Sequence, residues 1–328
     1  MQDPSSLAEE GLKEQLEKWK YEQLHIASQV LKIDDEIISE RTNDSNIYAC
    51  PKPPCTDKVL YGGVDVSFPE NESHQSVATY VILDPITDTT VYKDFLYFDL
   101  KIPYVSSFLS FREIEPLEFL VKKQIRESPS LTPFAILVDG NGILHQRRAG
   151  IACFLGVRTG LPTIGVAKTL YCEGGLQKEM VQDGIDNILL ELKSIHSEMK
   201  NPTERKETYA IIPTTPIVAN EKLPIKRNVD RTKMIKDLDP LCCGIGIMLK
   251  VNSDEVLGAA LLGHGGGVGT KREKEKGVRT KNPIYISIGH KISLQKALIL
   301  CAQLSKSRIP EPVRQADLWG RELLRNKK

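Results

Sequence analysis

The stretch Gly63–Phe68, which reads Gly-Val-Asp-Val-Ser-Phe, alternates apolar and polar side chains in the manner of a β-strand with two different faces. Residues 76–83 continue with β-branched and aromatic side chains, and residues 89–98 form a third such run after Asp84 and Pro85. Asp and Pro are common turn residues, and short turns join antiparallel neighbours. We therefore expect the three runs to form an antiparallel meander.

After residue 110 the pattern changes to helices that alternate with short strands. The strands are continuous apolar runs, because a strand that is buried on both faces needs no polar side. The expected helices are residues 117–125, 150–160 and 293–306 and a last helix opened by Pro310 and Pro312, and the expected strands are residues 134–138, 163–167, 256–262 and 283–288. This alternation predicts an α/β fold, a mixed sheet with helices on both faces.

The chain divides into an N-terminal part, residues 1–60, and one larger domain, residues 61–325. Capping-box spacing at Ser6 predicts a helix over residues 6–32, followed by a Pro-containing linker. The apolar stripe of this helix comprises Leu12, Leu16, Trp19, Ile26 and Val30. We expect the stripe to pack on the domain, with docking of a partner as the alternative. Residues 196–240 carry scattered prolines and charges with little periodicity, which indicates a flexible surface insertion rather than a second domain.

Composition argues against several classes of protein. The 328 residues have a net charge of +1, so no overall positive field marks a polyanion binder, and 41% hydrophobic with 27% charged residues is typical of a globular protein. No apolar run has the length of a membrane span, and the N-terminus lacks the order of a secretory signal. The seven cysteines form no CxxC pair, which argues against a zinc ribbon or a disulfide framework. We expect a reducing compartment: the cytosol, or the nucleus with its nucleolus.

Four ionisable residues lie in or directly after expected strands, namely Asp65, Asp139, Lys168 and His290. The carboxyl ends of strands border the ligand crevice in open α/β sheets, so these side chains could converge in one site. Each also has an ordinary explanation. Asp65 could face water from an edge strand, and Asp139 could begin a turn. Lys168 could be a solvated strand end, and His290 could cap the following helix.

Two or three carboxylates beside a lysine form a workable site for cutting phosphodiester bonds. Mg²⁺ prefers oxygen ligands, polarises the phosphoryl oxygen and promotes ionisation of water, while the lysine offsets charge on the phosphate. Other motifs are weaker. The glycine-rich run 263–267 lacks the ending of a phosphate-binding loop, and no nucleophile elbow supports serine catalysis. The loop Lys271–Lys281 has six basic and two acidic residues, a charge of +4 that is usual in a solvated loop but could attract nucleic acid.

Several short motifs, in order along the chain, resemble those of the endonuclease V family. They are Gly63–Ser67, Pro103–Ser106, Phe111–Glu113, Asp139–Gly142 with His145, Gly165–Lys168, Ser287–His290 and Arg308–Asp317. The resemblance covers about residues 62–172 and 256–325, and it is weak over residues 1–60. It implies a fold similar to ribonuclease H, in which the first three strands of a mixed sheet are antiparallel, and it makes residues 61–325 the catalytic domain.

The resemblance implies a catalytic set of Asp65, Glu113, Asp139, Lys168, His290 and Asp317. Within it, Asp65 and Asp139 match the metal-binding carboxylates, and the implied metal is Mg²⁺, for which Mn²⁺ can substitute. Pattern alone would make Glu113 or Asp317 an ordinary charge on a helix face. The lysine and the histidine match positions near the scissile phosphate.

Members of the family that this chain resembles cut the second phosphodiester bond 3′ to inosine and leave 3′-hydroxyl and 5′-phosphate ends. The base is turned out of the strand into a pocket. The matching pocket positions are Leu109, Gly140, Gly142 and Gly150, where glycine lets backbone groups reach the base edge. The wedge that fills the gap matches Pro103, Tyr104 and Val105. The residues expected to position neighbouring backbone are His145 and Arg147.

Ser106 stands where bacterial members usually carry proline, and Pro-Tyr-Val-Ser looks like the animal-type version of the wedge. The resemblance therefore favours single-stranded inosine-containing RNA as the substrate. A deoxyinosine-specific DNA repair endonuclease is the alternative within the same class. A catalytically silent inosine-RNA binding protein is the alternative outside it, although a binder would not need the complete catalytic set.

Overall fold

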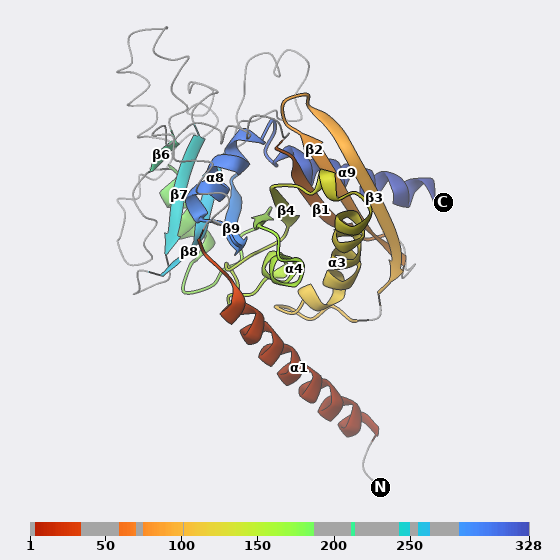
Figure 1. Ribbon diagram of the computed structural model, residues 1–328. Coiled ribbons are helices and arrows are strands. Elements are labelled where there is room, and N and C mark those ends of the chain that lie inside the picture. The colour runs from red at the N-terminus through yellow and green to blue at the C-terminus, as the bar shows by residue number, and fades with distance from the viewer. Residues whose placement is uncertain are drawn as a thin grey trace, which may run out of the picture.

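The structure of the protein is a computed structural model. It describes residues 4–33, 59–69, 75–100, 102–186, 211–213, 243–249, 255–262 and 282–327. The expected linker, the glycine-rich run 263–267, the loop Lys271–Lys281 and most of the expected insertion at 196–240 lie outside these residues. The described part is a mixed sheet with helices on both faces (Figure 1).

The sheet has nine strands in the part of the chain that the structure describes. In chain order they are β1 (Tyr61–Ser67), β2 (Gln75–Asp84), β3 (Thr89–Asp99), β4 (Ala135–Asp139), β5 (Thr163–Ala167), β6 (Ile211–Pro213), β7 (Cys243–Leu249), β8 (Val256–Leu262) and β9 (Ile284–His290). Across the sheet the order is β3-β2-β1-β4-β5-β9-β8-β7-β6. β2 pairs antiparallel with both β1 and β3, which confirms the expected meander.

Strands β1, β4 and β5 run parallel at the centre of the sheet. Val64 on β1 lies opposite Val138 on β4, and Asp139 lies opposite Val166 on β5. The carboxyl ends of the three strands therefore meet at one edge, which is where ligands bind in sheets of this kind. β9 continues the sheet beyond β5 in the antiparallel direction.

Strands β6 and β7 were not expected from the sequence. β7 reads Cys-Gly-Ile-Gly-Ile-Met-Leu, and glycine is depleted in strands, so the strand signal is diluted. β6 lies inside the region expected to be a surface insertion and pairs parallel with β7 at the end of the sheet. The sheet therefore extends further beyond β8 than the pattern of apolar runs indicated.

Helices pack on the two faces of this sheet. They are α1 (Pro4–Gln29), α3 (Ser110–Glu127), α4 (Ile151–Thr159), α8 (Leu294–Gln303) and α9 (Glu311–Asn326), with a 3₁₀ turn at Pro129–Leu131 and a helical stretch at residues 178–186. In Figure 1, α3 and α4 lie in front of the sheet, whereas α9 lies behind β1 and β2. No helix among the described residues combines the length and the apolar character that crossing a bilayer requires.

Helix α1 packs on the domain by its C-terminal half. Trp19 stacks on Phe111 with ring centroids 5.0 Å apart, and Ile26 is buried in the same core. Leu12 was expected on the same buried stripe, but it is 47% exposed, because the first turns of α1 project away from the domain (Figure 1). The expected packing is therefore present in the second half of the helix and was wrong for Leu12.

Candidate active site

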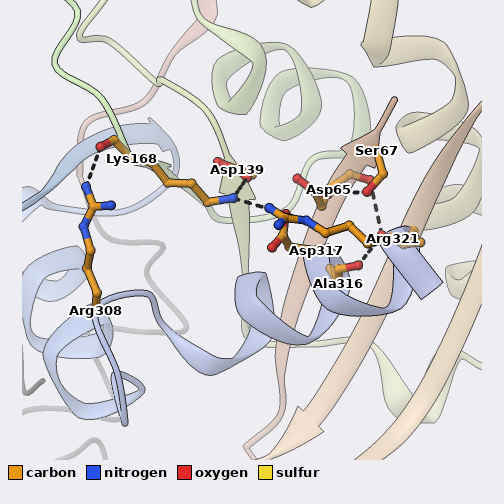
Figure 2. Close-up of polar contacts among 9 residues, drawn as sticks. Asp65, Ser67, Asp139, Lys168, Arg308, Ala316, Asp317 and Arg321 are labelled. Atoms are coloured by element: carbon orange, nitrogen blue, oxygen red, sulfur yellow. Dashed lines mark hydrogen bonds and ion pairs between the residues drawn. The ribbon is translucent and has the colours of Figure 1, made fainter. Parts of the chain in front are cut away.

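Three carboxylates from three elements meet at the carboxyl edge of the parallel strands. Asp65 lies on β1, Asp139 ends β4 and Asp317 lies on α9, and their carboxylate oxygens come within 4.8 Å of one another (Figure 2). Asp65 is buried, and the other two are half-buried. The pairing of Val64 with Val138 sets the first two side by side, because each aspartate follows its valine directly. The structure thus brings together the two carboxylates that the strand pattern placed at one edge.

Helix α9 packs close enough to the sheet to bring Asp317 to the other carboxylates because glycines stand at the contact. Gly63 on β1 faces α9, and Gly320 on α9 faces β1. A Cβ added to Gly63 on β1 would lie 2.1 Å from the carbonyl oxygen of Pro312. A Cβ added to Gly320 on α9 would lie 2.5 Å from Ser67 Oγ. Real Cβ atoms do not approach other heavy atoms so closely. A larger residue at position 63 would therefore push the α9 backbone off the sheet, whereas one at position 320 would first displace the Ser67 hydroxyl.

Two cations contact this carboxylate cluster. Lys168 Nζ donates to Asp139 Oδ2 at 2.5 Å and to Asp317 Oδ1 at 3.4 Å. Arg321, one helical turn after Asp317, donates to the same Asp317 oxygen at 2.8 Å (Figure 2). Arg308 donates to the backbone carbonyl oxygen of Lys168 and so fixes the end of β5. Sequence reasoning gave no role to Arg308 or Arg321, although the four-residue spacing of Asp317 and Arg321 is the usual signal for a helical ion pair.

The electrostatics of the cluster favour a bound cation. Burial raises the pKa of Asp65 well above its ordinary value, the charge and hydrogen bond of Asp139 raise it further, and the Lys168 ammonium opposes the shift. A proton or a metal ion relieves such repulsion between carboxylates. The ligand atoms are all carboxylate oxygens, which Mg²⁺ and Mn²⁺ prefer. The residues present therefore fit a hard divalent cation.

Glu113, in the first turn of α3, is a fourth acidic residue whose charge interacts with the cluster. Burial is the largest cause of its raised pKa, which is about 7, while the Arg112 guanidinium opposes the shift and the charge of Asp139 adds to it. Glu113 does not belong to the group of three carboxylates that meet within 4.8 Å among the described residues. A carboxyl group with a pKa near 7 can take up and release a proton at neutral pH.

His290 lies beside the start of β5, whereas the carboxylates lie at the carboxyl ends of the parallel strands. Because β9 is antiparallel to β5, His290 pairs with Thr163 at the start of β5. Asp139 lies opposite Val166, three residues further along that strand, which corresponds to about 10 Å. His290 Nδ1 accepts a hydrogen bond from the backbone N–H of Leu31, 3.3 Å away. The expectation that all four strand-end residues converge was wrong for His290, because its strand runs in the opposite direction.

The glycines expected to line a base pocket lie in a tightly packed loop after β4. Gly140 has a φ of 143°, a conformation that side chains disfavour. The N–H of Gly142 donates to Ser287 Oγ at 2.8 Å, and its carbonyl oxygen accepts from the N–H of Gly150 at 3.0 Å. These groups hold the loop together, and the contribution of Gly140, Gly142 and Gly150 to a base pocket stays a prediction. Asn141 Oδ1, in contrast, is buried and has no hydrogen-bond partner among the described residues.

The expected wedge is a loop that precedes α3. Tyr104 is 68% exposed, and Pro103 and Leu109 are also exposed. Val105 packs partly against the hydrophobic core and so anchors the loop. An exposed aromatic ring on an anchored loop can stack on a nucleobase.

The backbone carbonyl of Ser107 ties the wedge loop to two other parts of the molecule. It accepts hydrogen bonds from Gln23 Nε2 on α1 at 2.9 Å and from His145 Nε2 at 3.1 Å. A third donor is the guanidinium of Arg147, also at 2.9 Å. Burial is the main cause that lowers the pKa of His145 to about 4, so the imidazole is neutral at pH 7. His145 and Arg147 thus lie against the backbone of this loop, and the fully buried Gln23 joins them, a residue that sequence reasoning missed.

The family model described as Endonuclease V matches residues 47–212 and 250–318. Mouse Endonuclease V is 34% identical over 97% of this chain and 72% of its own length. Human Endonuclease V is 33% identical over 95% of this chain and 84% of its own length.

Solved structures of the same family share the architecture. The crystal structure of human ENDOV has a TM-score of 0.66 at 31% identity and covers 95% of this chain and 99% of the human one. A second structure is that of Ciona intestinalis Endonuclease V in complex with a 24mer DNA containing an inosine followed by a ribo-adenosine. It has a TM-score of 0.63 at 26% identity and covers 96% of this chain and 100% of the Ciona intestinalis chain. These neighbours confirm the predicted ribonuclease H-like fold. The chain therefore belongs to the endonuclease V family and is an endonuclease that hydrolyses phosphodiester bonds.

Proposed function

We propose that the protein cuts single-stranded RNA at the second phosphodiester bond 3′ to inosine, uses Mg²⁺ as cofactor, and leaves 3′-hydroxyl and 5′-phosphate ends. The observation that carries this proposal is the meeting of Asp65, Asp139 and Asp317 within 4.8 Å, with the Lys168 ammonium in contact. Such a group of carboxylates and a lysine supplies both a metal site and a cation for a phosphodiester substrate.

In the proposed reaction each residue of the cluster has a separate task. Asp65, Asp139 and Asp317 would hold Mg²⁺, and Mn²⁺ has the same ligand preferences. When bound, the metal polarises the phosphoryl oxygen and lowers the pKa of water. Lys168 balances the negative charge that builds on the phosphate during cutting. Glu113, whose charge interacts with that of Asp139, adds a fourth acidic side chain beside the cluster.

Inosine recognition is supported by a relative and by one side chain of this molecule. The Ciona intestinalis protein binds DNA that contains inosine. Hypoxanthine carries an N–H where adenine has an unprotonated ring nitrogen, so a buried acceptor favours hypoxanthine and repels the adenine nitrogen. Asn141 Oδ1 is a buried acceptor of this kind within the loop after β4. Tyr104, at 68% exposure, would fill the gap that the displaced base leaves.

Two observations support RNA as the preferred substrate. Ser106 occupies the wedge position where bacterial members usually carry proline. In the Ciona intestinalis complex, a ribonucleotide follows the inosine directly. Because the strand in that complex is otherwise DNA, cutting of deoxyinosine-containing DNA is the second candidate activity.

The test compares matched single-stranded RNA and DNA oligonucleotides that contain one inosine, each with Mg²⁺ and with EDTA. Strands with adenosine in place of inosine are the controls. We expect Mg²⁺-dependent cutting one nucleotide beyond inosine, faster on RNA than on DNA, and no cutting of the adenosine strands. Faster cutting of DNA would favour the second candidate, and inosine-dependent binding without any cutting would overturn the proposed activity.

A further inference from the structure

Two exposed aromatic rings, one on the wedge loop and one directly after β1, contact the same guanidinium. The Arg112 guanidinium carbon lies 5.5 Å from the ring centroid of Phe68 and 5.9 Å from that of Tyr104, so the two rings are at most about 11 Å apart. Phe68 is 45% exposed and Tyr104 is 68% exposed. A guanidinium with an exposed aromatic ring on each side offers stacking surfaces and hydrogen-bond donors to a ligand.

The position of Phe68 and Arg112 links them to the chemistry. Phe68 follows β1 three residues after Asp65, and Arg112 directly precedes Glu113 on α3. The contact of the Arg112 guanidinium with the Phe68 ring therefore involves chain segments that carry Asp65 and Glu113. Arg112 thus joins the Tyr104 ring of the wedge loop to the Phe68 ring at the end of β1.

The guanidinium of Arg112 also has unused hydrogen-bonding capacity. Its Nε is buried and has no hydrogen-bond partner among the described residues. A buried donor without a partner is costly, so such a group in a native structure calls for a ligand or solvent atom. Guanidinium groups bind phosphate through planar, paired N–H donors, and they stack on aromatic and base rings.

We propose that Phe68 and Arg112 bind the nucleotide directly 3′ to inosine, with its base stacked on Phe68 and its phosphate bonded to Arg112. This inference rests on the proposed function, in which the cut bond is the second one 3′ to inosine. One nucleotide must then span the distance from the wedge residue Tyr104 to the carboxylates. Arg112 contacts the Tyr104 ring and directly precedes Glu113, and Phe68 is three residues from Asp65, so the pair is within reach of that nucleotide. Stacking on an aromatic ring accepts any base.

The first test is the affinity of Phe68→Ala for two single-stranded RNAs in EDTA, measured by fluorescence anisotropy. One RNA carries a base on the nucleotide 3′ to inosine, and the other is abasic there. Stacking of one base is worth about 1–3 kcal/mol, so we expect about tenfold weaker binding of the complete RNA. The abasic RNA should bind equally well to the unaltered protein and to Phe68→Ala. Phe68→Tyr should bind the complete RNA as tightly as the unaltered protein does.

Phe119→Ala is the matched control, because Phe119 is a 51% exposed aromatic residue on α3 that makes no aromatic contact with Arg112 among the described residues. It should bind both RNAs like the unaltered protein. The inference would be overturned if Phe68→Ala lost the same affinity for the complete and the abasic RNA, or lost affinity for neither. If the unaltered protein binds inosine RNA no better than adenosine RNA, the proposed function fails as well, so the two failures are distinguishable.

Arg112→Gln tests the phosphate contact separately. It should weaken binding of the complete and the abasic RNA by the same factor, because both keep the phosphate. Loss of one phosphate contact also lowers the slope of log affinity against log salt by about 0.7 for single strands. An unchanged salt slope would contradict a phosphate contact at Arg112.

Discussion

Asp65 and Glu113 show how single residues prepare the site for its chemistry. In both carboxyl groups burial is the largest cause of a raised pKa, and the charge of Asp139 acts in the same direction. Ionising them in the absence of a further cation is therefore unfavourable. A metal ion removes this penalty, so the same environment that disfavours the free carboxylates favours the metal complex.

Glu113 gives the metal-free protein a pH-dependent stability. Its pKa of about 7 is above the ordinary value of 4.5, so its contribution is fully present below about pH 4.5 and is lost as the pH rises through 7. In EDTA we expect the thermal midpoint to fall by about 2–4 °C between pH 6 and pH 8. Glu113→Gln should reduce this fall, whereas the exposed Glu115→Gln should keep it in full. If the thermal midpoint of Glu113→Gln fell between pH 6 and pH 8 by as much as that of the unaltered protein, the raised pKa of Glu113 would be contradicted.

At the scale of elements, α1 and α9 hold the site from outside the sheet. α9 delivers Asp317 to the two strand carboxylates, and α1 reaches the wedge loop through Gln23. Both helices depend on a short contact with backbone: Gly63 against Pro312 for α9, and Gln23 against the Ser107 carbonyl for α1. Substitutions at these contacts should therefore change activity without touching a catalytic side chain.

Gln23→Ala should loosen the wedge loop. The change removes one donor from the Ser107 carbonyl and the acceptor of the Arg147 guanidinium, leaving buried polar groups less well satisfied. We expect a loss of about 1–3 kcal/mol in the free energy of unfolding, measured in urea, and about tenfold weaker binding of inosine RNA. Gln29→Ala, on the exposed face of the same helix, is the control and should leave both unchanged. Unaltered binding by Gln23→Ala would show that α1 does not position the loop.

Gly63→Ala should displace α9 from the sheet. The added Cβ would meet the Pro312 carbonyl oxygen at 2.1 Å, and backbone cannot rotate away as a side chain can. We expect a loss of about 1–3 kcal/mol in stability from overpacking, together with at least about tenfold slower cutting because Asp317 moves. Gly11→Ala on α1, where no atom lies within 4 Å of the added Cβ, should be neutral or slightly stabilising. Full activity in Gly63→Ala would contradict the tight contact of α9.

For the molecule as a whole, the centre of the sheet could be predicted from the sequence and its far edge could not. The meander and the short apolar strands have strong patterns, and parallel pairing then places Asp65 beside Asp139. β7 is diluted by glycine. The direction of β9 cannot be read from its own residues, because an apolar strand has the same pattern in both directions. That is why the position of His290 was predicted wrongly.

The candidate site, like the sheet, could be predicted from the sequence only in part. A carboxylate that interrupts or ends an apolar strand is a visible anomaly, whereas Glu113 and Asp317 lie on helices, where a charge is ordinary. Those two came from the family resemblance alone. Gln23 had a signal of its own, because it is a polar residue on the same helical face as Trp19 and Ile26. Partners of a buried polar residue cannot be named from one helix, since they come from distant loops.

Cutting of a single-inosine RNA by the unaltered protein and by Asp139→Asn is the decisive measurement. Asn keeps the shape of the side chain and removes its charge, so we expect the variant to fold and bind RNA but to cut at least about 100-fold more slowly in Mg²⁺. Asp88→Asn, at an exposed position away from the cluster, is the matched control and should cut like the unaltered protein. The unaltered protein should cut one nucleotide beyond inosine in Mg²⁺ and not in EDTA. Cutting by Asp139→Asn at the unaltered rate, or undiminished cutting in EDTA, would contradict a metal site built from these carboxylates.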